Sequence, residues 1–421
     1  MNEDFLHYLW QYQLLSPSLS STDGEKIEIL FPGYHNHNAG PDFLEAKIRI
    51  GEVIWAGNVE LHIQTSDWFR HKHQNDDNYD TIILHVAYKV DQKLFRKNGE
   101  AIPQLELKGK FNENSFAKYQ YFLQNKNWIA CEKMIHEAPR LIVNSWIDRL
   151  IVERMEKRSQ EIGERLQKTK NNWEQAFYET IARNFGFHTN AHAFESLARS
   201  LPLHIIAKQK NNLFQIEALL YGQAGLLQED FTDEYPVLLQ NEYEFLKRKF
   251  KLLPLSKNTW KFARMRPGNF PGIRIAQFAH LLYRSSKLFS KILEQKNLKD
   301  VQELFKVEVS AYWQTHYSFD KISPHRKKSL SSQGINLILI NTIIPFLYYY
   351  GKNRNNEEML NRALKFLEQI PGEKNAITNQ WKKLDLTVNS ALHTQALLHL
   401  KNEYCKRKQC LKCGIGVHLL K

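Results

Sequence analysis

The chain has 421 residues, a formal net charge of +13 and four cysteines. This length suffices for two domains that each have a hydrophobic core, and so few cysteines exclude a disulfide-stabilised secreted scaffold. The first residues are acidic and do not form a secretion signal, and Asn336, Asn341 and Pro345 interrupt the longest apolar stretch. We therefore expect a soluble, cytoplasmic protein without membrane association, and the sequence does not define its oligomeric state.

Charge is divided unevenly along the chain. Residues 1–120 contain 12 Lys+Arg and 17 Asp+Glu, a net charge of −5, whereas the other 301 residues contain 46 Lys+Arg and 28 Asp+Glu, a net charge of +18. An acidic module that binds cations, joined to a basic module that binds a polyanion, predicts nucleic acid as the partner. A solvated lysine-rich surface is the alternative.

The first 125 residues have the pattern of a β-rich module. Apolar residues at helical spacing predict an opening helix over 4–15, and Gly51-Glu52 between two apolar runs predicts a hairpin. Runs of β-branched and apolar residues predict five strands, over 26–31, 43–50, 52–64, 81–90 and 101–108.

Two carboxylates lie where the strands of this hairpin are expected to meet. Asp42 precedes the strand 43–50, and Glu60 and His62 lie two residues apart on 52–64, so their side chains face the same side. Mg²⁺ or Mn²⁺ binds few protein groups and prefers carboxylate oxygens. We therefore predict Asp42 and Glu60 as ligands of Mg²⁺ or Mn²⁺, and His62 as the residue that orients or deprotonates the attacking water. The alternative is a hairpin with a solvated Glu60 and a turn-capping Asp42.

The pair Pro41-Asp42 followed by Glu60-Leu61-His62 resembles the motif of the PD-(D/E)xK nuclease superfamily, and a helix followed by strands resembles its core. The resemblance implies metal-dependent cleavage of DNA or RNA. His62 stands where the superfamily usually has a lysine, and an imidazole can act as a base, a hydrogen-bond donor or a metal ligand. This departure raises a second hypothesis, a catalytically inactive nucleic-acid-binding protein.

More histidines follow the hairpin. His71 and His73 come after the second strand, and His85 lies on the strand 81–90. In an extended segment His71 and His73 would share a face and could bind a metal, and a zinc site would need three or four such ligands. A third hypothesis is therefore a metal-dependent hydrolase of a small substrate. The alternative is that these histidines are half-buried and bonded to backbone groups.

From about residue 139 the apolar period changes to 3.6 and predicts a larger all-α basic domain over 135–404. A long charged helix from 141 to 166 is followed by helices over 173–185, 190–200, 212–227, 237–249, 271–292, 298–314, 334–350, 356–369, 374–383 and 389–404. The fold class is therefore α+β, with an N-terminal mixed sheet and opening helix over 1–125, the all-α domain, and a cysteine-containing tail over 405–421.

One loop of the helical domain combines cations with an aromatic residue. Arg264, Arg266 and Arg274 lie around Phe270, just before or within the start of a predicted helix. We predict that the arginines contact phosphates and that Phe270 stacks on a base. The alternative is a structural loop held by hydrogen bonds from its arginines.

The cysteines have a spacing that suits a metal. Cys405, Cys410 and Cys413 form a C-x₄-C-x₂-C group, and Cys131 is the only other cysteine. Four thiolates suit a structural Zn²⁺ or a [4Fe–4S] cluster, and adjacent lysines favour thiolates by charge. Some PD-(D/E)xK nucleases carry such a cluster on one distant cysteine and a C-terminal trio, but their lone cysteine precedes the nuclease motif and their spacing differs. Ordinary reduced thiols are the alternative.

Several short strings spread over the whole chain resemble a bacterial family, domain-of-unknown-function family 2851. They are NAGPDF, GNVE-x-H, SDW-x₂-H-x-H, RNFGF, GQAGLL, RPGNFP-x₂-R and C-x₄-C-x₂-C. This resemblance implies no particular chemistry, so the nuclease hypothesis depends on Asp42, Glu60 and His62.

Overall fold

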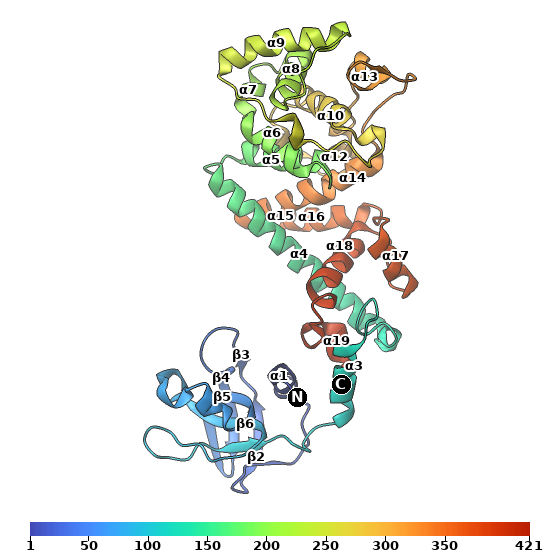
Figure 1. Cartoon of the computed structure of the whole chain (residues 1–421). Coiled ribbons are helices and arrows are strands. Elements are labelled where there is room, and N and C mark those ends of the chain that lie inside the picture. The colour runs from blue at the N-terminus through green and yellow to red at the C-terminus, as the bar shows by residue number, and fades with distance from the viewer. The chain divides into compact units, whose positions relative to one another are not determined.

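The computed structural model describes all 421 residues, and the chain divides into two compact units. The first contains residues 1–148, 383–385 and 398–421, and the second contains 149–382 and 386–397. Figure 1 shows a sheet in the N-terminal part and helices through most of the remaining chain, so the predicted α+β class is confirmed. The first unit thus includes residues 398–421. The predicted boundaries instead placed 398–404 in the helical domain and 405–421 in a separate tail.

The sheet of the first unit is mixed. Its strands are ordered β1-β2-β4-β5-β6-β7, and β3 also pairs with β4. The strands β2, β4 and β5 pair antiparallel in that order, whereas β6 is parallel to β5 and β7 is parallel to β6. Their bounds are β1 Leu19–Ser20, β2 Lys26–Phe31, β3 Tyr34–His35, β4 Phe43–Ile50, β5 Val53–Gln64, β6 Ile82–Lys89 and β7 Gln104–Glu106.

A short crossover connects the parallel strands β5 and β6. It contains the helix α2 (Asp67–Arg70) and two 3₁₀ turns, η1 (His73–Asn75) and η2 (Asp77–Tyr79). The side chain of Trp68 anchors it in a buried cluster with Tyr79, Ile82, Leu94 and Ile102. Gly57 permits close pairing at the base of the crossover, because a Cβ there would lie 2.4 Å from the Ile83 side chain.

The opening helix α1 (Glu3–Gln11) begins at Asn2, whose side chain accepts a hydrogen bond from the Phe5 N–H. The ring of Phe5 stacks on Tyr119 of α3 (Glu113–Gln124) with 5.3 Å between centroids. The indole of Trp10 donates to the Pro32 carbonyl at 2.9 Å. These buried contacts hold the helix beside the sheet, where it also approaches β5.

The C-terminal residues complete this unit. Helix α19 (Gly414–Leu420) accepts hydrogen bonds at its Val417 and Leu419 carbonyls, from the Tyr8 hydroxyl and the Lys118 ammonium, both at 3.2 Å. Its neighbours in this segment are a π-helix, η7 (Leu400–Cys405), and a 3₁₀ turn, η8 (Cys410–Lys412), and η3 (Ile135–Glu137) is a further 3₁₀ turn of the unit.

The helical region begins with α4 (Arg140–Lys168), whose last twenty residues belong to the second unit. The predicted helix 271–292 is two helices, because Lys287 has a left-handed backbone with φ of 53°. The predicted helix 298–314 is also interrupted, whereas 334–350 is continuous through a π-helix at Leu339–Ile343. The helices that follow α4 are α5 Trp173–Phe185, α6 Ala191–Ser200, α7 Leu203–Ala207, α8 Leu213–Gln223, α9 Glu234–Phe250, α10 Pro271–Arg284, α11 Leu288–Glu294, α12 Leu298–Leu304, α13 Ala311–Thr315, α14 Ser332–Ile338, α15 Ile344–Asn353, α16 Glu357–Gln369, α17 Ala376–Lys383 and α18 Ala391–His399. Two 3₁₀ turns lie between them, η4 Lys257–Thr259 and η5 Pro267–Asn269. A small hairpin is formed by β8 His316–Ser318 and β9 Lys321–Ile322.

One helical stretch, 332–353, is long and apolar enough to cross a membrane by length and composition alone. Its most apolar window is 72% buried inside the structure. The core helix of a soluble protein passes the same test, so this one helix is weak evidence for a membrane span.

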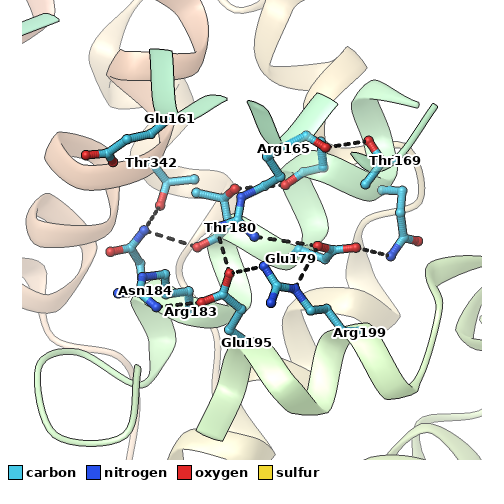
Figure 2. Close-up of polar contacts among 12 residues, drawn as sticks. Glu161, Arg165, Thr169, Glu179, Thr180, Arg183, Asn184, Glu195, Arg199 and Thr342 are labelled. Carbon is cyan, nitrogen blue, oxygen red and sulfur yellow. Dashed lines mark hydrogen bonds and ion pairs between the residues drawn. The ribbon is translucent and has the colours of Figure 1, made fainter. Parts of the chain in front are cut away.

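An ion-pair network connects α4, α5 and α6. Figure 2 shows the buried carboxylate of Glu195 among three arginines. Its oxygens lie 2.8 Å from Arg165, 2.5 Å from Arg183 and 2.7 Å from Arg199. Burial alone would raise the pKa of Glu195, but these cations outweigh it and the pKa is lowered.

We expect Glu195→Gln to destabilise the second unit by about 2 to 4 kcal/mol, because the variant leaves partly buried cations without a counter-charge. The matched control is Glu161→Gln, which removes the partner of Arg158 in a pair that is 34% and 58% exposed and should change stability by less than about 1 kcal/mol. Urea unfolding at neutral pH measures both changes. Equal effects of the two substitutions would contradict this interpretation.

Candidate metal centre

Antiparallel pairing of β4 with β5 brings Asp42 and Glu60 together. Phe43 pairs with Val59, which places the residue before Phe43 opposite Glu60. The Asp42 N–H donates to Glu60 Oε2 at 3.0 Å, and the Leu61 N–H donates to Asp42 Oδ2 at 3.0 Å. Each carboxylate thus accepts a hydrogen bond from the backbone of the other segment, which differs from the alternative of a solvated Glu60 and a turn-capping Asp42.

Three histidines gather beside Glu60. His62 shares its face of β5, while His71 and His73 come from the crossover, in a turn around Lys72 with φ of 61°. His71 and His73 are therefore not on an extended segment, yet both approach His62. One nitrogen from each of the three rings lies within 4.8 Å of the others.

The distances among these side chains match those around a tetrahedral metal ion. His62 Nε2 lies 3.2 Å from His71 Nδ1 and 3.6 Å from Glu60 Oε1, and His73 Nε2 lies 3.4 Å from the same oxygen. Ligands at about 2.0 to 2.1 Å from a tetrahedral ion are about 3.3 to 3.4 Å apart. The three imidazoles are therefore a candidate ligand set, with the Glu60 carboxylate close to two of them, and the sequence did not reveal this grouping.

The carboxyl groups of the site influence each other strongly. Burial, and then the charges of Asp42 and Glu3, raise the pKa of Glu60 to about 9. Burial would also raise the pKa of Asp42, but the neighbouring His7, whose Nε2 is 3.1 Å away, and the Leu61 N–H outweigh it, and the pKa is lowered. Burial and Asp42 raise the pKa of Glu3. A cation would relieve this repulsion.

The environment of His62 keeps its ring neutral. Burial, followed by the charges of His85, His73 and His71, lowers the pKa of His62 to about 2. Its Nδ1 lies 2.8 Å from Nε2 of His85, and burial lowers the pKa of His85 to about 3. A metal ion on Nε2 of His62 would place the proton on Nδ1, from which it is donated to His85. His62 is thus neutral where the nuclease motif has a cationic lysine, and its Nε2 lies near His71 and Glu60.

Sequence reasoning missed His7 and the role of His85. His7 lies four residues after Glu3, so the spacing i, i+4 on one helix face was a usable signal. His85 was visible as a polar residue in an apolar strand, but its contact with His62 depends on the parallel register, in which Glu60 pairs with His85.

The loop predicted to bind nucleic acid lies in the second unit. Arg264 and Arg266 are exposed, whereas the guanidinium of Arg274 is 4.4 Å from the Phe187 ring and bonded to Asn269 and Gln277. Burial lowers the pKa of Arg274 to about 10. Arg274 therefore holds the loop together, as in the structural alternative. The half-buried Phe270 lines a surface cavity with Phe262 and Trp313.

The four cysteines lie together, apart from the histidines in sequence, and all line one small cavity.

The fold and this site define an α+β protein with a carboxylate–histidine cluster suited to a metal ion. A family model described as a protein of unknown function (DUF2851) matches residues 3–376, so the chain belongs to that family. The matched region ends before the three C-terminal cysteines. No curated protein and no solved structure matches the chain.

Proposed function

We propose that this protein is a divalent-metal-dependent phosphodiesterase that cleaves nucleic acid. The observation that carries the proposal is the position of the Glu60 carboxylate. One of its oxygens is bonded to the backbone of Asp42, and the other lies among the imidazoles of His62 and His73. A single buried side chain thus connects a carboxylate site with a histidine site.

The order of elements supports a nuclease rather than another metal-dependent hydrolase. A helix, three antiparallel strands, a crossover and a parallel strand follow one another as α1, β2, β4, β5, α2 and β6. This order resembles the core of the PD-(D/E)xK superfamily, and the short crossover supplies the connection that the sequence did not reveal. We assign Asp42 and Glu60 to the acidic positions of the motif that they resemble.

The ligand types favour a metal other than Mg²⁺. Mg²⁺ binds oxygen and keeps its waters, whereas imidazole suits Zn²⁺ and other transition metals. Three imidazoles beside Glu60 therefore favour Zn²⁺ at the histidines, whereas Mn²⁺ suits the carboxylates. Asp42 and Glu3, which face Glu60, offer oxygen ligands for a second cation or for the water around the first.

The proposed reaction is hydrolysis of a phosphodiester. A cation lowers the pKa of bound water and neutralises charge on the phosphate. Water attacks phosphorus, one P–O ester bond breaks, and the proton lost by the water is balanced by the proton that the leaving oxygen gains. Asp42, whose lowered pKa keeps it ionised, orients the water through an accepted hydrogen bond.

The charge of the chain supports a polyanionic substrate. Residues 121–421 carry a net charge of +18. Contacts between several phosphates and lysines or arginines make affinity fall steeply with salt. Arg264 and Arg266, both exposed, are the cations of the proposed loop that are free of the internal bonds made by Arg274.

We expect Asp42→Asn to lower cleavage of a labelled oligonucleotide by at least about a hundredfold in Mn²⁺ or Zn²⁺, because the site loses the ionised carboxylate that orients the water. The control is Glu45→Gln, which alters an exposed carboxylate of the same strand. Binding measured without cleavage should stay within about twofold. Wild-type cleavage by the Asp42 variant would refute the proposed site, and metal binding without any cleavage would indicate an inactive nucleic-acid-binding protein.

A second candidate is a hydrolase of small substrates at the same metal, favoured by the compact set of His62, His71 and His73. Salt separates the two functions. Cleavage of an oligonucleotide at limiting substrate should fall steeply between low and high salt, whereas cleavage of a small aryl phosphodiester should not. Activity on small esters alone, independent of salt, would favour the second candidate.

A further inference from the structure

Four cysteines from two distant parts of the chain surround one cavity. Cys131 lies in the turn after α3, Cys405 ends the π-helix η7, Cys410 begins η8, and Cys413 precedes α19. The cavity is small, about 20 Å³, and no cysteine forms a disulfide. The other lining residues are Ala130, Tyr404, Gln409 and Gly416, so only the thiols are good metal ligands there.

The backbone around the cavity is tightly packed. A Cβ on Gly416 would lie 2.3 Å from the Cys410 carbonyl oxygen, and one on Gly414 would lie 2.7 Å from the Trp146 ring. The π-helix η7 inserts an additional residue per turn just before Cys405, a feature often found at functional sites. The backbone that carries Cys405, Cys410 and Cys413 is therefore tightly packed and departs from regular α-helix geometry.

Without a cation these thiols stay neutral. Burial has the largest effect on the pKa of each thiol, and at Cys131, Cys405 and Cys410 the neighbouring cysteines add to it. The pKa of Cys410 rises to about 12, and that of Cys405 rises well above its usual range. The nearby lysines do not reverse this, contrary to the expectation from the sequence. Lys408 is bonded to backbone carbonyls and Lys406 to Asn402. A bound metal is the cation that would convert these thiols to thiolates.

We propose that Cys131, Cys405, Cys410 and Cys413 hold a [4Fe–4S] cluster. Four sulfurs at about 2.3 Å from one zinc ion are about 3.8 Å apart, in van der Waals contact, and leave no space between them. The four cysteines do not have this spacing: the ligand atoms of His62, His71 and His73 lie within 4.8 Å of one another, whereas those of no three cysteines do, so the group that the cysteines fit is larger than one ion. The backbone N–H groups of Gly416 and Ile415 bond to Cys413, and such bonds stabilise a cluster-bound sulfur.

The test is metal and sulfide analysis of the full chain purified without oxygen. We expect about four iron and four acid-labile sulfide per chain, with a brown colour that oxygen or a chelator bleaches. Cys410→Ser and Cys405→Ser should each lose most of the iron. The control is Gln409→Ala, which alters a lining residue without removing a thiolate and should keep the iron.

Other results would overturn the proposal. One zinc per chain without iron would replace the cluster by a single ion. Absence of both metals, with four thiols that react readily with an alkylating reagent in the native protein, would show that no metal site exists. If a serine variant fails to fold, as circular dichroism would reveal, the composition of the wild-type protein still decides between these results.

Discussion

Glu60→Gln is expected to make the metal-free protein more stable than the wild type at pH 8, by about 1 to 3 kcal/mol. The pKa of Glu60 is raised from 4.5 to about 9 in the folded protein. Between these pH values the folded state retains a proton that the unfolded chain has lost, so stability falls as pH rises. Glutamine has nearly the shape of a protonated glutamate and does not titrate. The free energy of unfolding of the variant, measured with urea in the presence of a chelator, should therefore depend less on pH than that of the wild type.

The same comparison with metal present should reverse the order. Zn²⁺ or Mn²⁺ competes with the proton at Glu60 and should stabilise the wild type, whereas the variant has lost a ligand. Glu52→Gln, at an exposed position just before β5, is the control and should follow the wild type in both conditions. A Glu60 variant that keeps the wild-type pH profile and metal response would show that this carboxyl is not the coupled group.

His62→Lys is expected to lower metal affinity by at least about tenfold to a hundredfold and to abolish metal-dependent cleavage. The substitution restores the usual residue of the nuclease motif, but the site opposes a cation there, because burial and three histidines lower the pKa of His62 to about 2. Isothermal titration with Zn²⁺ and cleavage assays measure the two effects.

The matched control is His136→Lys, which changes an exposed histidine of the same unit and should leave both measurements unchanged. Retained cleavage by His62→Lys would instead mean that position 62 supplies charge, as in the nuclease superfamily, and that the histidines do not coordinate the metal.

Local patterns were sufficient to predict many elements of the fold. The strands 26–31 and 43–50 and the helix 173–185 have the predicted bounds, because each has a clear period, and the helix begins with an Asn172 cap. The parallel pairing of β5 with β6 was not predicted, since alternation along a strand does not distinguish parallel from antiparallel neighbours. The helices α2, α3, α7 and α19 were also missed; three of them are too short for a period to be visible.

In the candidate site, too, contacts between residues of one hairpin were predictable and contacts that depend on the tertiary fold were not. Asp42 and Glu60 meet because a hairpin fixes their register locally, so their proximity followed from the sequence. The meeting of His71 and His73 with His62 depends on a left-handed residue and a crossover, neither of which has a periodic signal. The four cysteines were recognisable by number and spacing, but their common cavity required the C-terminal segment to return to the first unit.

That return affects how the protein is made. Residues 398–421 belong to the same unit as the sheet, yet 149–382 lie between them in the chain. On the ribosome the helical unit is largely synthesised while α1 still lacks the Val417 carbonyl that its Tyr8 hydroxyl contacts, and while Cys131 lacks its three neighbours. The first unit therefore stays incompletely packed until residues 398–421 leave the ribosome. During that time it is most accessible to proteases and chaperones.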